Sequence, residues 1–160
     1  MCDRLASLQR LQVFCADQGE AIGGGCGLTL ACDIRVATAR ARFGITPARL
    51  GLVYPLHDTA LLVDLVGAGQ ARRLMLSGMV IGAEEALRMG LIEEIAESAH
   101  ALCATIAGNS AFSAAGIKQT IVSVLAGQRQ EDEASLALFA SAFTEGDFSQ
   151  RAAAFLKRKA

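Results

Sequence analysis

The run Gly19-Glu-Ala-Ile-Gly-Gly-Gly-Cys-Gly-Leu-Thr-Leu-Ala-Cys-Asp-Ile-Arg-Val-Ala37 places three consecutive glycines, Gly23 to Gly25, directly before an apolar stretch that can begin a helix. Glycine tolerates positive φ and lets a ligand approach the backbone closely. A helix that begins here points its free N–H groups at whatever occupies the turn, and its dipole favours negative charge at that spot. The run therefore predicts a place that can hold a developing oxyanion.

The glycine run also fits other interpretations. Glycine-rich strand-to-helix turns bind phosphate, and many are tight turns without a ligand. The absence of Gly-x-x-x-x-Gly-Lys-Ser/Thr argues against a P-loop, and the spacing over 23–27 does not match the dinucleotide fingerprint. The residues alone leave open an anion site and a purely structural turn.

The composition indicates one domain with a substantial core, since 52% of the 160 residues are hydrophobic. A formal net charge of −1 argues against a nucleic-acid partner, which needs a basic surface. No apolar run reaches the roughly 20 residues that span a bilayer. The N-terminus lacks the apolar core of a signal peptide, so we expect a cytoplasmic protein with no membrane partner.

The cysteines and histidines argue against a metal site. No Cys-x-x-Cys pair occurs, and the only histidines are His57 and His100. An odd number of cysteines, several in apolar runs, is typical of reduced, buried thiols in the cytosol. The five cysteines are Cys2, Cys15, Cys26, Cys32 and Cys103.

Apolar spacing and glycine or proline breaks predict a strand-rich first third and a helix-rich remainder. Extended segments are expected over residues 8–16, 34–37, 41–43 and 91–95. Helices are expected over residues 27–31, 59–66, 70–76, 83–89, 99–107, 111–125, 131–143 and 149–159. This order is seen where helices pack around one side of a sheet.

Six segments in order resemble the enoyl-CoA hydratase/isomerase (crotonase) family from about Val13 to the C-terminus. They are Gly-Glu-Ala-Ile-Gly-Gly-Gly-Cys-Gly at 19–27, Ala-Cys-Asp-Ile-Arg at 31–35, Arg-Phe-Gly-Ile-Thr-Pro-Ala-Arg-Leu-Gly at 42–51, Leu-Ser-Gly at 76–78, Ala-Glu-Glu-Ala-Leu-Arg-Met-Gly-Leu-Ile at 83–92 and Ala-Ala-Phe-Leu-Lys-Arg at 153–158.

The resemblance implies an α/β fold, a crotonase-like ββα spiral that is N-terminally truncated and followed by a helical region. We expect a partial spiral core over 1–98 and a trimerisation-type helical region over 99–160. It also implies homotrimers or dimers of trimers, and an acyl-CoA substrate of fatty acid metabolism. Coenzyme A would enter as part of that substrate, so no separate cofactor is expected.

In the family, two backbone N–H groups stabilise an enolate-like oxyanion, and the resemblance assigns one of them to Gly24. The second comes from an earlier loop, for which the twenty-two residues before Gly23 leave too little chain. The first strands of the spiral should be absent as well. An unpaired sheet edge and an exposed apolar face then predict strong self-association.

Both positions where typical hydratases carry a glutamate depart from the family pattern. Gly27 stands two residues after the third glycine, and Ala48 follows Pro47. Hydration needs a carboxylate to activate water and a proton donor for the α-carbon. Neither glycine nor alanine can do either task, so the usual mechanism is not carried over to these positions, and a non-catalytic acyl-CoA binder or an inactive homologue stays open.

Other residues are candidates for the missing chemistry. The resemblance places residues 52–58 along the acyl pocket, where Tyr54 could donate a proton and His57 could act as a base, although His57 also fits a surface loop. Asp58 is expected to cap a helix that begins at Thr59 or Ala60. The other substrate-binding candidates are Ile22, Gly23, Gly25, Gly27, Pro47, Ala48 and Leu52.

The basic tail has two interpretations. It suits the C-terminal end of a solvated helix, or Phe155 and Arg158 could contact the adenine and phosphates of coenzyme A, as the resemblance implies. Glu20 is expected to face solvent or the coenzyme A side. Glu84 and Glu85 are expected to lie on a solvated helix face.

Overall fold

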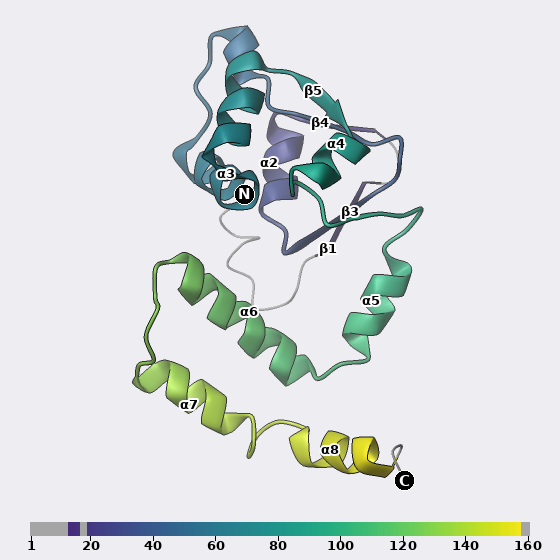
Figure 1. The fold of residues 1–160 in the computed structure, drawn as a ribbon, viewed down its shortest axis with the longest axis vertical. Helices are drawn as coiled ribbons and strands as arrows, with labels where there is room; N and C mark the ends of the chain where they lie inside the picture. The colour runs from purple at the N-terminus through teal and green to yellow at the C-terminus, as the bar shows by residue number, and fades with distance from the viewer. Residues whose placement is uncertain (1–12, 17–18, 158–160) are drawn as a thin grey trace. The chain divides into compact units, whose positions relative to one another are not determined.

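The computed structural model describes residues 13–16 and 19–157 of the chain (Figure 1). The chain divides into two compact units, Met1–Cys103 and Ala104–Ala160, and the division falls within helix α5 (His100–Ala107). In the described part of the chain, every strand belongs to the first unit, and the second unit is helical.

Two three-stranded sheets form the framework of the first unit. The strands are β1 (Val13–Ala16), β2 (Glu20–Ile22), β3 (Ile34–Ala37), β4 (Arg42–Gly44), β5 (Val80–Gly82) and β6 (Glu94–Ile95). One sheet has the order β1-β3-β6 and is parallel throughout; in the other, β4 pairs parallel with β2 and antiparallel with β5. Parallel neighbours need a crossover. The glycine-rich segment after β2 lies in two of the three crossovers, β1 to β3 and β2 to β4.

Helices cover these sheets and supply much of the core. They are α2 (Gly24–Leu30), the 3-10 helix η1 (Pro47–Leu50), α3 (Leu56–Ser77) and α4 (Ala83–Arg88). Helix α2 packs against β2 and α3. The largest fully buried side chains are Phe43, Ile45, Leu62, Leu74, Leu91 and Ile92. The hydrophobic effect of this cluster fixes α2 and α3 against the strands that carry the glycine turn.

The element bounds agree with the sequence where the spacing is strong. The predictions of 34–37 for β3 and 111–125 for α6 are confirmed, whereas α2 begins earlier than residue 27. The helices predicted over 59–66 and 70–76 form one element, α3, with a break at Gly67. Gly67 has φ 74° and ψ 158°, a conformation that favours glycine.

A buried arginine links β3 to the segment before β6. The Arg35 side chain is 4% exposed, and its Nη2 lies 2.5 Å from Glu93 Oε1. Arg35 Nη1 donates to the Cys32 carbonyl oxygen at 2.6 Å, and the backbone N–H of Arg35 donates to Glu93 Oε2 at 2.6 Å. A buried charge is stable only with such partners, so this pair fixes how the chain enters β6.

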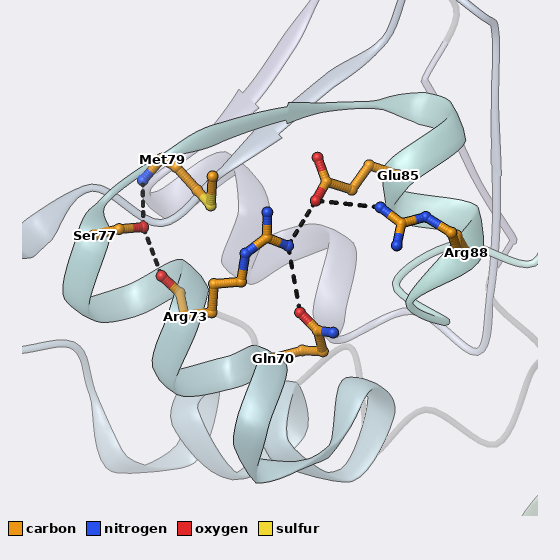
Figure 2. A network of polar contacts seen from close by, with 6 residues as sticks. All are labelled: Gln70, Arg73, Ser77, Met79, Glu85 and Arg88. Carbon is orange, nitrogen blue, oxygen red and sulfur yellow. Dashed lines mark hydrogen bonds and ion pairs between the residues drawn. The ribbon is translucent and has the colours of Figure 1, made fainter.

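An ion-pair network joins α3 to α4 (Figure 2). Arg73 Nη1 lies 2.6 Å from Glu85 Oε1 and 3.4 Å from Gln70 Oε1. Arg88 Nη2 lies 3.5 Å from the same Glu85 oxygen. Glu84 is exposed, but Glu85 is paired and half-buried, so the expectation that both lie on a solvated face is wrong for Glu85.

The second unit contains the rest of α5 and three further helices. These are α6 (Ala111–Leu125), α7 (Glu133–Ser141) and α8 (Phe148–Lys157). Phe143 makes edge-to-face contacts with Phe139 and Phe148, at centroid distances of 5.4 and 5.2 Å, which hold the start of α8 near the end of α7. Among the helices in the described ranges, none is both long and apolar enough to cross a bilayer.

Candidate functional site

The glycine run forms a sharp turn between β2 and α2. Gly23 has φ 57° and ψ −117°, a conformation that residues with a Cβ rarely adopt. Its N–H donates to the Gly44 carbonyl oxygen at 2.9 Å, and its own carbonyl accepts from the Gly27 N–H at 3.1 Å. The turn is therefore tied to β4 on one side and starts the helix on the other.

The first amides of α2 are available at this turn. Gly24 and Gly25 are both exposed, and a Cβ added to either would meet nothing within 4 Å. The first N–H groups of a helix have no partner within it, and no described residue accepts a hydrogen bond from the Gly24 amide. The space beside Gly24 can therefore admit a ligand oxygen, and the helix dipole favours negative charge there.

Tyr54 belongs to the same group of residues. Its hydroxyl donates to the Gly23 carbonyl oxygen at 3.0 Å, so the segment after η1 is connected directly to the turn. The side chain is half-buried and packs against the core. The sequence singled out both residues, and the structure brings them together.

Asp58 points a carboxylate at the buried face of α2. A Cβ added to Gly27 would lie 2.8 Å from Asp58 Oδ2 and 3.0 Å from the Tyr54 hydroxyl oxygen. The prediction that Asp58 caps a helix beginning at Thr59 or Ala60 is wrong, because α3 begins at Leu56 with Pro55 as its N-cap and without a side-chain cap. The sequence did not predict this contact with α2, although Asp58 lies in the segment that the resemblance aligned with the acyl pocket.

Burial raises the pKa of the Cys26 thiol, which lies between the glycine turn and Gly27. Desolvation raises its pKa from 9.0 to about 12, a hydrogen bond with the Gly44 backbone opposes the rise, and the negative charge of Asp58 adds to it. Cys26 is 1% exposed and is a free cysteine. This thiol is therefore a protonated core group and not a nucleophile.

The remaining candidates are more exposed. His57, in the first turn of α3, is exposed, as is Ala48, and Leu52 is 61% exposed. Ile22, at the end of β2, and Pro47, at the start of η1, are half-buried.

Three charged or aromatic candidates remain, namely Glu20, Phe155 and Arg158. Glu20 is exposed, with Oε1 3.9 Å from Arg42 Nη1. Phe155 is 58% exposed on α8, in the second unit, and Arg158 falls outside the described residues. In the part of the chain that the structure describes, no group of three or more His, Cys, Asp or Glu side chains could hold a metal ion.

Comparison with known proteins gives consistent matches. The family model described as enoyl-CoA hydratase/isomerase matches residues 4–160. A short-chain-enoyl-CoA hydratase of Clostridium acetobutylicum is 42% identical over 94 residues, which are 59% of this chain and 36% of that protein. The chain spans 36% to 59% of the length of the first curated relatives it matches.

Solved structures agree in fold. An enoyl-CoA hydratase/isomerase family protein from Hyphomonas neptunium is 33% identical, with a TM-score of 0.92 over 98% of this chain and 62% of that one. DspI of Pseudomonas aeruginosa is 30% identical, with a TM-score of 0.83 over 98% of this chain and 62% of that one. The mixed α/β fold is thus crotonase-like, and the resemblance carried by the six sequence segments is confirmed: the chain belongs to the enoyl-CoA hydratase/isomerase family.

Proposed function

We propose that this protein acts on an acyl-CoA thioester of the 2-enoyl type, and that the Gly24 N–H holds the thioester oxygen as it becomes anionic. Family membership supports the substrate class, as do the names of relatives such as the short-chain-enoyl-CoA hydratase of Clostridium acetobutylicum. Coenzyme A enters as part of the substrate, so the reaction needs no separate cofactor.

The Gly24 amide carries the proposal, because it is exposed and donates to no acceptor among the residues that the structure describes. The thioester oxygen gains charge only as the reaction proceeds, so a donor aimed at it stabilises the transition state more than the bound substrate. A donor fixed in place by the Gly23 turn needs no reorganisation when the charge appears. The Gly23 N–H bond to Gly44 and the Tyr54 bond to Gly23 supply that rigidity.

Several residues around the turn are proposed to bind the substrate. Ile22, Gly25 and Gly27 flank the oxyanion position, and Pro47, Ala48 and Leu52 line the approach for the acyl chain. Phe155 and Arg158 remain candidates for the adenine and phosphate end. We also propose assembly as a homotrimer or a dimer of trimers, because family members assemble in this way.

The direct test combines binding with turnover. Titration calorimetry with butanoyl-CoA, a saturated thioester that cannot be hydrated, should detect binding, and crotonyl-CoA should be hydrated to the 3-hydroxyacyl thioester. Free coenzyme A is the control, because an oxyanion site should favour the thioester over the thiol. If no thioester binds to the assembled protein, the proposal fails.

A second candidate function is a non-catalytic acyl-CoA binder. Gly27 and Ala48, at the positions where typical hydratases carry glutamates, favour it. A binder would take up butanoyl-CoA but leave crotonyl-CoA unchanged over long incubation. Turnover that is lost in Tyr54→Phe or His57→Ala would exclude it.

A further inference from the structure

The absence of a side chain at Gly27 is matched by a carboxylate that occupies the same space. Gly27 is buried in α2, and its Cβ position lies 2.8 Å from Asp58 Oδ2 and 3.0 Å from the Tyr54 hydroxyl oxygen. Real Cβ atoms essentially never lie within 3.0 Å of such atoms. Position 27 therefore accommodates no side chain while Asp58 stays in place, and two polar oxygens converge one helical turn below the Gly24 amide.

The helix that carries Asp58 does not explain this orientation. Asp58 is the third residue of α3, where an acidic side chain interacts favourably with the helix dipole. That effect is equally available to a carboxylate that faces solvent. Instead the carboxylate faces α2, where its negative charge helps to raise the pKa of the buried Cys26 thiol.

We propose that Asp58 is the catalytic carboxylate of this site, acting first as the general base and then as the general acid. This proposal rests on the proposed function, since it needs a 2-enoyl thioester bound at Gly24. Tyr54 is a positioning residue: its hydroxyl lies beside the Asp58 carboxylate and donates to the Gly23 carbonyl oxygen, so it ties the acid–base group to the oxyanion turn.

A single carboxylate completes the addition of water. The water oxygen bonds to C3 of the enoyl thioester while its proton passes to Asp58. The π electrons of the C2–C3 double bond move into a C1–C2 double bond, and the negative charge moves to the thioester oxygen beside the Gly24 N–H. Asp58 then returns the proton to C2, which restores the thioester carbonyl and leaves a 3-hydroxyacyl thioester and an ionised Asp58.

Electrostatics favours this sequence. An ionised Asp58 would raise the energy of a nearby enolate, because the two negative charges repel each other. Because the carboxylate takes up a proton as the enolate forms, the two negative charges do not coexist. As negative charge builds up on the thioester oxygen, it makes Asp58 a stronger base, and at the same moment the Gly24 N–H binds that oxygen most strongly.

The first experiment replaces Asp58 by asparagine, which keeps the shape and removes the basic oxygen. Hydration of crotonyl-CoA by Asp58→Asn should fall about a hundredfold or more, whereas the Kd for butanoyl-CoA should stay within about twofold of wild type. Asp64→Asn is the matched control: it is an exposed aspartate on the same helix, and it should leave both quantities unchanged.

The second experiment moves the carboxylate to the other helix. Gly27→Glu alone should unfold more easily, because its Cβ meets Asp58 Oδ2. In the double variant Gly27→Glu/Asp58→Ala the closest contact is removed and the Tyr54 hydroxyl, 3.0 Å from the Cβ position, has to shift only slightly. Turnover should then recover at least about tenfold over Asp58→Ala. Recovery would show that a carboxylate in this place supports turnover. A folded double variant that does not recover would contradict the proposal, also where Asp58→Asn does not fold.

The outcomes separate this proposal from the proposed function. If wild type hydrates crotonyl-CoA and Asp58→Asn keeps its rate within about threefold, Asp58 is not the acid–base group, and the proposed function stands. If wild type binds butanoyl-CoA but never hydrates crotonyl-CoA, the binder interpretation replaces both. If no thioester binds, the site at Gly24 is itself excluded.

Discussion

At the scale of single residues, the conformation of Gly23 decides whether the oxyanion turn can exist. With φ 57° and ψ −117°, Gly23→Ala should lower the free energy of unfolding by about 1–3 kcal/mol, because a Cβ is strained there. Urea denaturation measures the change. Gly25→Ala is the matched control: its φ is not positive and its Cβ position is empty, so it should leave stability unchanged or slightly raise it. Equal losses in both variants would contradict the strain argument.

The Cys26 thiol should make stability fall at alkaline pH. Its pKa is about 12 in the folded protein against 9.0 for an ordinary thiol, so above pH 9 the unfolded chain loses a proton that the folded chain keeps. The free energy of unfolding then decreases by up to about 1.4 kcal/mol per pH unit until the folded thiol also ionises. Comparing the pH slopes of wild type and Cys26→Ala isolates this contribution. A slope that is the same in both would show that the thiol ionises equally in the folded and unfolded chains.

The same residues show what a sequence reveals about a site. The glycine turn could be predicted because conformational freedom is a local property of Gly23 and its neighbours. The contact between Asp58 and Gly27 could not, because it depends on the packing of α3 against α2 across a long stretch of chain. Capping chemistry is the usual local explanation of an aspartate before a helix, and it concealed the role of Asp58 here.

At the scale of elements, a polar cluster organises the start of α6. The Ser110 hydroxyl accepts from the Ser113 N–H at 3.3 Å as the N-cap. Hydrogen bonds from Ser110 and from the Arg151 guanidinium hold the pKa of Asp147 below its usual value. Arg151 Nη1 also donates to the Gly108 carbonyl oxygen at 2.9 Å. The cluster therefore links the first turns of α6 and α8.

Ser110→Ala should destabilise the protein by about 1 kcal/mol, because the buried hydroxyl is the cap of α6. Thermal or urea unfolding followed by circular dichroism measures the loss. Ser113→Ala is the control, since only its backbone N–H takes part in the cap and its side chain is exposed. A loss of the same size in Ser113→Ala would mean that the capping bond is not the cause.

Helices and strands in which apolar residues recur regularly could be predicted from the sequence, whereas very short strands could not. The apolar spacing along α6 and the buried run of β3 are long enough to carry their own signal. Strands β2 and β5 have three residues each, which is too short for an alternating pattern, and they exist because β4 pairs with them on both sides. The sheet, rather than the local sequence, defines these strands.

At the scale of the whole molecule, the apolar face of α6 predicts self-association. Ile117, Ile121 and Leu125 are 60%, 53% and 63% exposed, and their spacing of four places them on one side of the helix. Exposed apolar stripes of this kind mark interaction surfaces. Sedimentation velocity should therefore give a mass well above the 16.7 kDa of one chain. Ile121→Lys should shift the distribution towards the mass of one chain, because burying a lysine in an apolar contact is unfavourable.

Gln119→Lys, an exposed polar position on the same helix, is the matched control and should leave the distribution unchanged. A single 16.7 kDa species at every concentration would contradict the proposed assembly while leaving the chemistry at Gly24 to be judged by thioester binding.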